Sequence, residues 1–323
     1  MITATSMLYL YVETPLHAGT GSGLSSIDLP IQRERTTQYP MIQGSGIKGK
    51  LRATAEDALD ADKLTQTEVD ILFGPSTPVK KKSNGTETTP QDKNESTRDD
   101  HAGALIAGDA RILLFPVRSL NGVFAYTTSY DVLSRFKRDI ERVEKALPWT
   151  VPTRPADENT ALVTTKSEVH SNKAIVLEEF SYEANVEQAQ AVDSIANWLV
   201  TNALPALGGD YWANKLKNSL IILPDDVFRD FALYATEVIT RVRINRDTKT
   251  VENGALWTEE HLPTDTLMYV PIYATSGRKK DKDISAKEVL STMQALDTSY
   301  LQLGGDETVG RGLVRLRWGN VIK

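Results

Sequence analysis

Cysteine is absent from this chain of 323 residues. Its absence excludes disulfide bonds, thiolate zinc sites and a cysteine nucleophile, and it is compatible with a cytoplasmic protein. The sequence also lacks an apolar run long enough to span a bilayer, and residues 1–6 lack the charged start of a secretory signal. We therefore expect neither a membrane anchor nor secretion.

Acidic residues outnumber basic residues in the chain as a whole, 43 to 37. The formal net charge is -6 and the pI is about 5.4, which argues against a protein that binds nucleic acid over its whole surface. Any RNA contact must therefore be confined to local patches. The composition, with 40% hydrophobic and 25% charged residues, is otherwise that of an ordinary soluble protein with a real core.

The segment from His17 to Arg52 concentrates both glycine and positive charge. Two groups of glycines bracket it: Gly19, Gly21, Gly23, Gly44, Gly46 and Gly49. Glycine lets the backbone bend and approach another molecule closely. The acids Asp28 and Glu34 are outnumbered by the basic residues Arg33, Arg35, Lys48, Lys50 and Arg52. This local excess of positive charge predicts a polyanion as the partner.

A helix is predicted at 47–59, because apolar residues recur there at four-residue spacing. Residues 44–46 would form a glycine turn at its N-terminus, where backbone N–H groups and the Lys48 ammonium favour an anion. The alternative is that Ser45 only caps the helix.

Strands and helices alternate along the rest of the chain. Buried strands are predicted at 7–13, 107–117, 174–180, 220–223, 266–274 and 313–318. Helices are predicted at 130–147, 186–204 and 227–234, and after 282 through to 303. This order predicts an α+β fold in which helices cover the faces of a sheet.

Two further segments stand out by composition. Residues 76–103 have almost nothing to bury, which predicts a flexible insertion. Residues 239–251 alternate β-branched and basic side chains, which predicts an exposed hairpin. Arg243 and the nearby Trp257 suit single-stranded nucleic acid, through charge and stacking. The alternative is a solvated edge strand whose charges prevent aggregation.

Four motifs in this order resemble the backbone subunit of the type III-B CRISPR RNA-guided effector, the Cmr complex, within the RAMP superfamily. They are TPLHAGTGSG, IDLPIQRERTTQYPMIQGSGIKGKLR, TKTVENGALWTEEHLP and the glycine loop GGDETVGRG. The resemblance covers nearly the whole chain apart from residues 76–103.

The resemblance implies a single RAMP-type domain over 1–323, with a ferredoxin-like, RRM-related core, inserted loops and a protruding β-hairpin thumb around 239–262. It implies copies stacked head to tail along a CRISPR guide RNA beside other subunits of the effector, as an interface that does not close allows. It also implies that each copy cuts the paired target RNA at regular intervals with a divalent metal, Mg²⁺ or Mn²⁺.

The resemblance also assigns residues. It marks Asp28 as the residue required for cleavage, with His17 as its companion, and it assigns RNA contacts to Lys48, Lys50, Arg52 and the glycine loop that carries Arg311. We add three residues to the expected RNA-binding set: Arg33, Arg243 and Trp257. A groove of positive potential containing Lys48, Lys50, Arg52 and Arg311 is expected.

RNA carries its own nucleophile, a 2′-hydroxyl beside each phosphorus, so the protein must supply mainly geometry, charge neutralisation and a proton acceptor. Asp28 alone can hold a metal whose other ligands are water and phosphate oxygens, so metal affinity is expected only with RNA present.

Several of the expected site residues also have an alternative, purely structural interpretation. Asp28 can pair with Arg33 or Arg35, or cap a turn. His17 can be a structural histidine, Trp257 can be a packing residue, and the acids at 259–260 can be solvated. Two other functions stay open: a purely structural guide-RNA-binding subunit, and a guide-processing endonuclease with a histidine-based site. The second is the weakest, because the chain has only 4 histidines.

Overall fold

The computed structural model describes residues 2–23, 26–61, 63–76, 101–143, 146–279, 283–296 and 298–321. A 13-stranded mixed sheet runs through the molecule, in the order β14-β15-β1-β13-β4-β5-β10-β6-β9-β8-β7, with β2 beside β4 and β3 beside β13. Its strands are β1 (Ala4–Val12), β2 (Met41–Ile42), β3 (Leu105–Ala107), β4 (Ala110–Arg118), β5 (Phe124–Ser129), β6 (Thr160–Val163), β7 (His170–Ser171), β8 (Ala174–Leu177), β9 (Phe180–Asn185), β10 (Leu220–Leu223), β13 (Leu267–Ala274), β14 (Tyr300–Gln302) and β15 (Leu313–Trp318).

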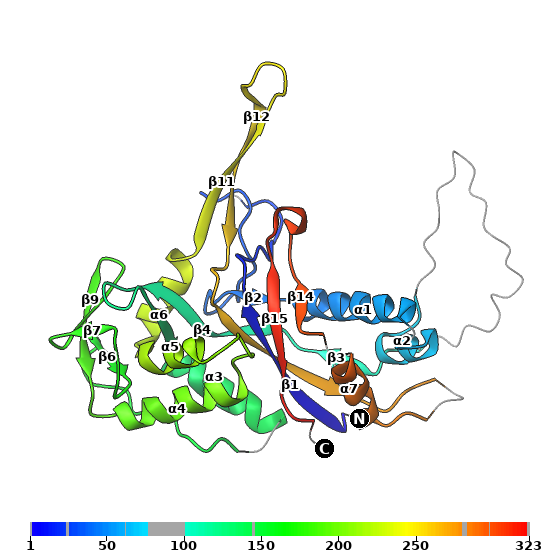
Figure 1. Cartoon of the computed structure of the whole chain (residues 1–323), viewed down its shortest axis with the longest axis horizontal. Coiled ribbons are helices and arrows are strands. Elements are labelled where there is room, and N and C mark those ends of the chain that lie inside the picture. The colour runs from blue at the N-terminus through cyan, green and yellow to red at the C-terminus, as the bar shows by residue number, and fades with distance from the viewer. Residues whose placement is uncertain are drawn as a thin grey trace, which may run out of the picture.

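Helices pack against this sheet and lie between its strands in the chain (Figure 1). They are α1 (Gly44–Asp60), α2 (Gln66–Phe73), α3 (Tyr130–Val143), α4 (Ala189–Asn202), α5 (Tyr211–Ser219), α6 (Asp225–Tyr234) and α7 (Ala286–Ala295), with a 3₁₀ turn η2 (Glu307–Val309). This arrangement confirms the predicted α+β class. No helix in the described ranges is both long and apolar enough to cross a membrane.

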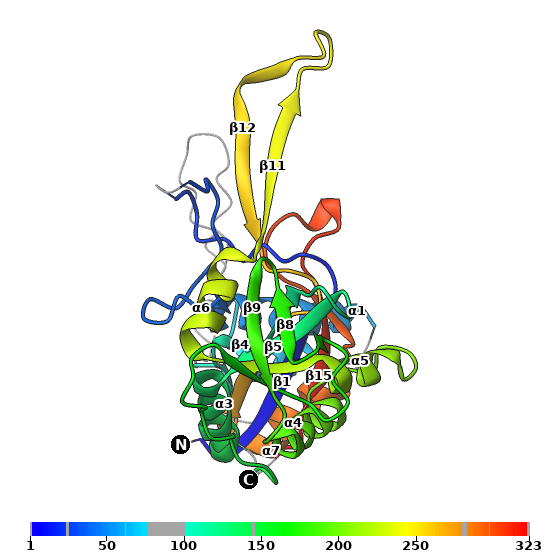
Figure 2. The same cartoon turned by 90° about the vertical axis from the view of Figure 1, so that its left-hand side faces the viewer.

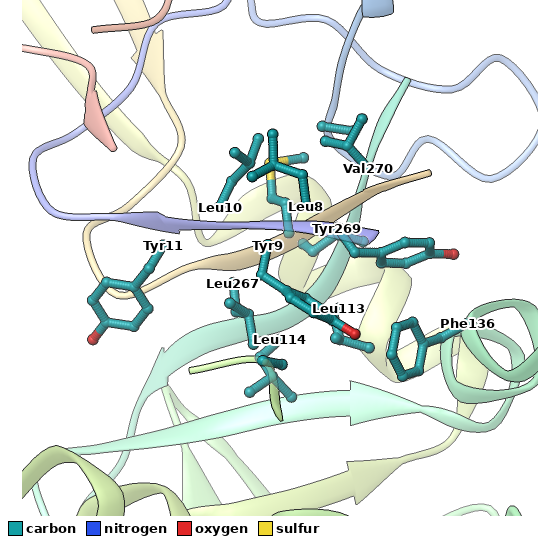
Figure 3. Close-up of a cluster of buried hydrophobic side chains, with 14 of the residues drawn as sticks. Leu8, Tyr9, Leu10, Tyr11, Leu113, Leu114, Phe136, Leu267, Tyr269 and Val270 are labelled. Carbon is teal, nitrogen blue, oxygen red and sulfur yellow. The ribbon is translucent and has the colours of Figure 1, made fainter. Parts of the chain in front are cut away.

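Strand β1 lies at the centre of the core, antiparallel to β13 on one side and β15 on the other. Successive side chains point to opposite faces of a strand, as Leu8 and Tyr9 do in Figure 3. Tyr9 faces α3, where its ring lies 6.4 Å from that of Phe136. Ser6, on the Leu8 side, accepts a hydrogen bond from Gln294 of α7. The two helices therefore cover opposite faces of β1, which explains why both of its faces are apolar.

A separate hairpin, β11 (Glu237–Ile244) with β12 (Val251–His261), projects from one end of the molecule (Figures 1 and 2). Its outer part exposes both apolar and charged side chains, whereas residues 259–261 at its base are buried. The loop between β14 and β15 lies beside this base in both views. The sequence prediction of an exposed hairpin is confirmed, and its base contacts the rest of the domain.

Several predicted boundaries are wrong. Helix α1 begins at Gly44 rather than 47. Residues 174–180 are not one strand, because β8 ends at Leu177, the chain turns at 178–179 and Phe180 begins the antiparallel β9. The helix expected through 303 ends at Ala295, and β14 follows it. The expected insertion at 76–103 lies, apart from its two ends, outside the described residues.

Candidate nucleic-acid interface

A cleft of about 620 Å³ opens where the first and last glycine-rich segments meet the start of α1. Its lining includes His17, Gly19, Gln32, Gly46, Lys50 and Gly305. Segments that are far apart in the sequence therefore form one concave surface. Glycines on its walls leave room for another backbone to approach closely.

Close contacts with His17 require glycine at two positions that line the cleft, 19 and 304. The N–H of Gly305 donates to the carbonyl oxygen of His17 at 2.9 Å. Gly304 has φ 77°, and a Cβ added there would lie 2.2 Å from the same carbonyl oxygen. A Cβ on Gly19 would lie 2.5 Å from His17 Nε2. Any side chain at 304 or 19 would therefore displace the histidine.

The start of α1 differs from the sequence prediction. Residues 44–46 form its first turn, and the preceding Gln43 is the N-cap without a side-chain cap bond, so a capping role for Ser45 is wrong. The N–H of Gly44 donates to Asp109 Oδ1 at 2.8 Å, and that of Gly46 donates to the Gln43 carbonyl. Two of the three amides expected to bind an anion are therefore already engaged.

The three basic residues expected to bind RNA from α1 lie on two different faces of this helix. Lys50 lines the cleft, whereas Lys48, Arg52 and Arg311 are not among its lining residues. Arg52 donates from Nε to Glu56 at 2.8 Å, one turn further along the helix. Burial, together with Arg52 and Arg278, lowers the pKa of Lys48. The expectation of one groove containing all four cations is wrong, since positions 48 and 50 lie about 200° apart around a helix.

Asp28 is exposed and attached to the base of the hairpin. Its Oδ2 accepts hydrogen bonds from the N–H and the hydroxyl of Thr258, at 2.8 and 2.9 Å. These bonds lower the pKa of Asp28, so its carboxylate is ionised at neutral pH. The expected alternative, a pair with an arginine, is wrong. Thr258 lies 230 positions away within the third of the four motifs, where nothing in the sequence marks it as the partner of Asp28.

His17 has a defined tautomer. Its Nδ1 lies 2.7 Å from the carbonyl oxygen of Glu260, and because a carbonyl oxygen only accepts, Nδ1 carries the hydrogen. Nε2 of the neutral ring is then a proton acceptor. The ring lines the cleft. His17 therefore combines a structural hydrogen bond with an available base, so the two alternatives are compatible.

Arg33 and Glu260 form an ion pair within the fold. Arg33 Nη2 lies 2.5 Å from Glu260 Oε1, and the two side chains are 12% and 3% exposed. Arg33 also donates to the carbonyl oxygen of Ala232, at the end of α6. The guanidinium is thus committed to protein partners, and the expectation that Arg33 binds RNA is not supported. The alternative of solvated acids at 259–260 is wrong, because both side chains are buried.

The remaining buried acid of the hairpin base, Glu259, forms part of a second cluster. Its Oε1 accepts from Trp257 Nε1 at 2.7 Å, and its Oε2 lies 3.4 Å from Arg241 Nε. Arg241 also donates to Asp306 Oδ1 at 3.0 Å. Trp257 is half-buried and its ring N–H is bonded to Glu259, and its stacking on a base stays a prediction.

His261 lies at the centre of this cluster and is fully buried. Its ring centroid is 5.4 Å from that of His17. Burial, with His17 and Arg311 nearby, lowers the pKa of His261, which favours the neutral ring.

Arg243 lies further out on the hairpin, exposed and 3.7 Å from Glu252. Of the expected RNA-binding residues, Arg243 is therefore the most accessible on the hairpin.

The fold and this site define a class of protein. The family model described as RAMP superfamily matches residues 9–315. The chain belongs to the RAMP superfamily. A similar protein is the CRISPR system Cmr endoribonuclease Cmr4 of Pyrococcus furiosus, 39% identical over 309 residues, which cover 95% of this chain and 93% of that protein. The CRISPR system CMR subunit Cmr4 of Saccharolobus solfataricus is 28% identical over 98% of this chain and 97% of its own. The resemblance inferred from the four motifs is confirmed.

Solved structures agree with this relationship. The oligomeric Cmr4 from Pyrococcus furiosus has a TM-score of 0.70 at 30% identity, covering 99% of this chain and 100% of that one. A chain of the type III-B Cmr-beta complex bound to cognate target RNA has a TM-score of 0.68 at 20% identity, covering 98% of both. At that identity the second comparison shows a shared fold.

Proposed function

We propose that this chain is a repeating subunit of a type III-B CRISPR effector, which binds guide RNA and cleaves complementary target RNA at regular intervals. The observation that carries the proposal is the attachment of Asp28 and His17 to one stretch of β12. Asp28 accepts a hydrogen bond from the N–H of Thr258, and His17 Nδ1 donates one to the carbonyl oxygen of Glu260. Two residues of a strand span about 7 Å, so a carboxylate and an imidazole are held close together at the base of the projecting hairpin.

The surfaces around this pair suit RNA. Lys50 and the glycine-lined cleft provide charge and close access for a phosphate backbone, and Arg243 and Trp257 extend along the hairpin. The related Cmr4 of Pyrococcus furiosus is oligomeric. Head-to-tail copies of this chain, beside other effector subunits in the cytoplasm, would repeat the Asp28 site along one guide, which accounts for regularly spaced cuts.

The chemistry follows from the nucleophile that RNA contains. The 2′-oxygen of the target forms a bond to the adjacent phosphorus, the bond from phosphorus to the 5′-oxygen breaks, and water supplies the proton for that leaving oxygen. His17 Nε2 is the candidate acceptor of the 2′-hydroxyl proton, a role that contributes about 10²–10⁴-fold in enzymes generally. The hairpin holds the target nucleotide so that attack is in line.

Asp28 also fits a divalent cation. An exposed, ionised carboxylate is the hard oxygen ligand that Mg²⁺ and Mn²⁺ prefer, and Mg²⁺ sites commonly combine one or two carboxylates with water and phosphate. A bound cation would supply charge neutralisation at the phosphate. A single protein carboxylate predicts weak binding without RNA.

The test is target cleavage by the reconstituted guide-loaded complex at fixed Mg²⁺, with the parent chain and Asp28→Asn. Equal assembly with loss of the regularly spaced cuts is expected. Unchanged cutting by Asp28→Asn would leave this chain as a purely structural guide-RNA-binding subunit. Asp57→Asn, an acid on α1, is the matched control and is expected to cut like the parent.

A further inference from the structure

Three side chains at the base of the hairpin form a cluster that the cleavage chemistry does not use. They are Glu259 and His261 of β12 and Asp306 of the loop before η2. One potential ligand atom from each lies within 4.8 Å of the other two. His261 Nε2 is 3.8 Å from Glu259 Oε2 and 3.6 Å from Asp306 Oδ2. Tetrahedral ligands at about 2.1 Å from an ion are about 3.4 Å apart, so only a small closure would complete such a site.

His261 supplies the second observation. The side chain is fully buried, and within the described part of the chain neither ring nitrogen forms a hydrogen bond. Glu259 Oε2 is likewise buried without a hydrogen-bond partner among those residues. Buried polar atoms in folded proteins are nearly always bonded, so orphaned atoms that face one another indicate a missing partner.

Neighbouring donors orient the two carboxylates. Trp257 Nε1 binds the far oxygen of Glu259 at 2.7 Å, and Arg241 Nη2 binds the far oxygen of Asp306 at 3.0 Å. In each carboxylate the remaining oxygen faces His261. Such outer hydrogen bonds hold ligands in place around protein-bound metals. Arg241 also approaches Glu259 Oε2 at 3.4 Å, so it offsets part of the negative charge of the two acids.

We propose that Glu259, His261 and Asp306 bind a divalent transition-metal ion, of the class of Zn²⁺ or Mn²⁺, that ties the hairpin to the last glycine loop. One imidazole and two carboxylates suit these ions better than Mg²⁺, which takes oxygen ligands. The site is separate from Asp28 and binds its ion without RNA. Its role is structural, because it joins two segments whose mutual position sets the base of the hairpin.

Equilibrium dialysis of the isolated chain against Co²⁺, after chelator treatment, tests the proposal with visible absorption as the readout of ligation. The parent and Asp28→Asn are expected to retain one Co²⁺ each and to show the same spectrum. Asp306→Asn and His261→Gln are expected to lose it. Asparagine is tolerated in the left-handed conformation that residue 306 adopts, φ 61°. Glu307→Gln, an exposed acid on the same loop, is the matched control and is expected to retain the ion.

Two further readouts separate a metal site from a charge network. Trp257→Phe removes only the outer hydrogen bond and is expected to weaken Co²⁺ binding by about 10–100-fold. Zn²⁺ is expected to raise the melting temperature of the parent but not of Asp306→Asn. A parent that retains no more Co²⁺ than Asp306→Asn would overturn the proposal, as would equal retention by His261→Gln. Because no step depends on RNA or cleavage, this result is independent of the Asp28 experiment.

Discussion

Asp28 Oδ2 accepts two hydrogen bonds from Thr258, one from the backbone N–H at 2.8 Å and one from the hydroxyl at 2.9 Å. The two residues lie 230 positions apart in the chain, and the contact fixes an exposed acid at the base of the hairpin. The hydroxyl also accepts a bond from the Asp28 N–H at 3.0 Å. Thr258 therefore fixes the position of the proposed cleavage residue and lowers the pKa of its carboxyl.

Thr258→Val tests this relationship. The backbone bond, which is the larger cause of the lowered pKa, survives, while the hydroxyl bond is lost. The pKa of Asp28 is expected to rise, so its carboxylate becomes protonated at a higher pH. The acid limb of the plot of cleavage rate against pH therefore moves to higher pH. Cleavage at the acid end of the profile is therefore expected to fall, whereas cleavage at neutral pH stays at the parental level.

The measurement is the pH dependence of target cleavage by the assembled complex. Thr248→Val, at the exposed tip of the hairpin, is the control for the loss of a threonine hydroxyl. An acid limb that stays at the parental pH in Thr258→Val would show that this hydroxyl does not govern the ionisation of Asp28.

The Arg33–Glu260 pair predicts a stability effect. Glu260→Gln leaves the Arg33 guanidinium nearly buried without its counter-charge, and breaking a buried pair costs about 3–5 kcal/mol. Urea unfolding of the isolated chain measures this loss. Glu252→Gln, which removes an acid 3.7 Å from Arg243 on the exposed part of the hairpin, is expected to change stability by less than about 0.5 kcal/mol. Similar losses in both variants would contradict a structural role for Glu260.

Local patterns in the sequence identified the elements that carry their own signal. The hairpin follows from alternating β-branched and basic residues, and α3 follows from a strong apolar stripe that ends before Pro148. Helix α2 was missed although Thr65 and Glu68 form a capping box, a signal that the sequence does contain. Short elements are therefore recoverable when their caps are considered as well as their periodicity.

The site itself was only partly predictable. Asp28 and His17 were identified through motifs, but the bonds that position them join residues more than 200 positions apart. The sequence gives no local sign that Arg33 turns inward to Glu260. The predicted helix at 47–59 already places Lys48 and Lys50 on different faces, but which face lines the cleft depends on where the helix meets the last glycine loop. Tertiary packing decided these outcomes.

Gly304→Ala tests the close approach that shapes the cleft. Its φ of 77° is unfavourable for alanine, and the added Cβ would lie 2.2 Å from the carbonyl oxygen of His17. Backbone must therefore move, and a loss of at least about 1–3 kcal/mol is expected from the strained conformation alone. Gly49→Ala is the opposite case. It lies within α1, where a Cβ meets nothing within 4 Å, so about 0.5–1 kcal/mol of stabilisation is expected. Thermal unfolding of both variants distinguishes the two effects, and equal melting temperatures would refute the steric argument.

Lys50 provides the sharpest test of where RNA lies, because it is the one residue of the expected cationic groove that lines the cleft. Lys50→Ala is expected to weaken guide binding and to reduce the slope of log affinity against log salt by about 0.7, the value for one lost phosphate contact on a single strand. Lys287→Ala, on the exposed side of α7, is the matched control for loss of one positive charge. Guide affinity is measured by titration across a salt series. If both variants show the parental slope, the guide does not run through the cleft, and the outer face of α1, with Lys48 and Arg52, becomes the surface to examine.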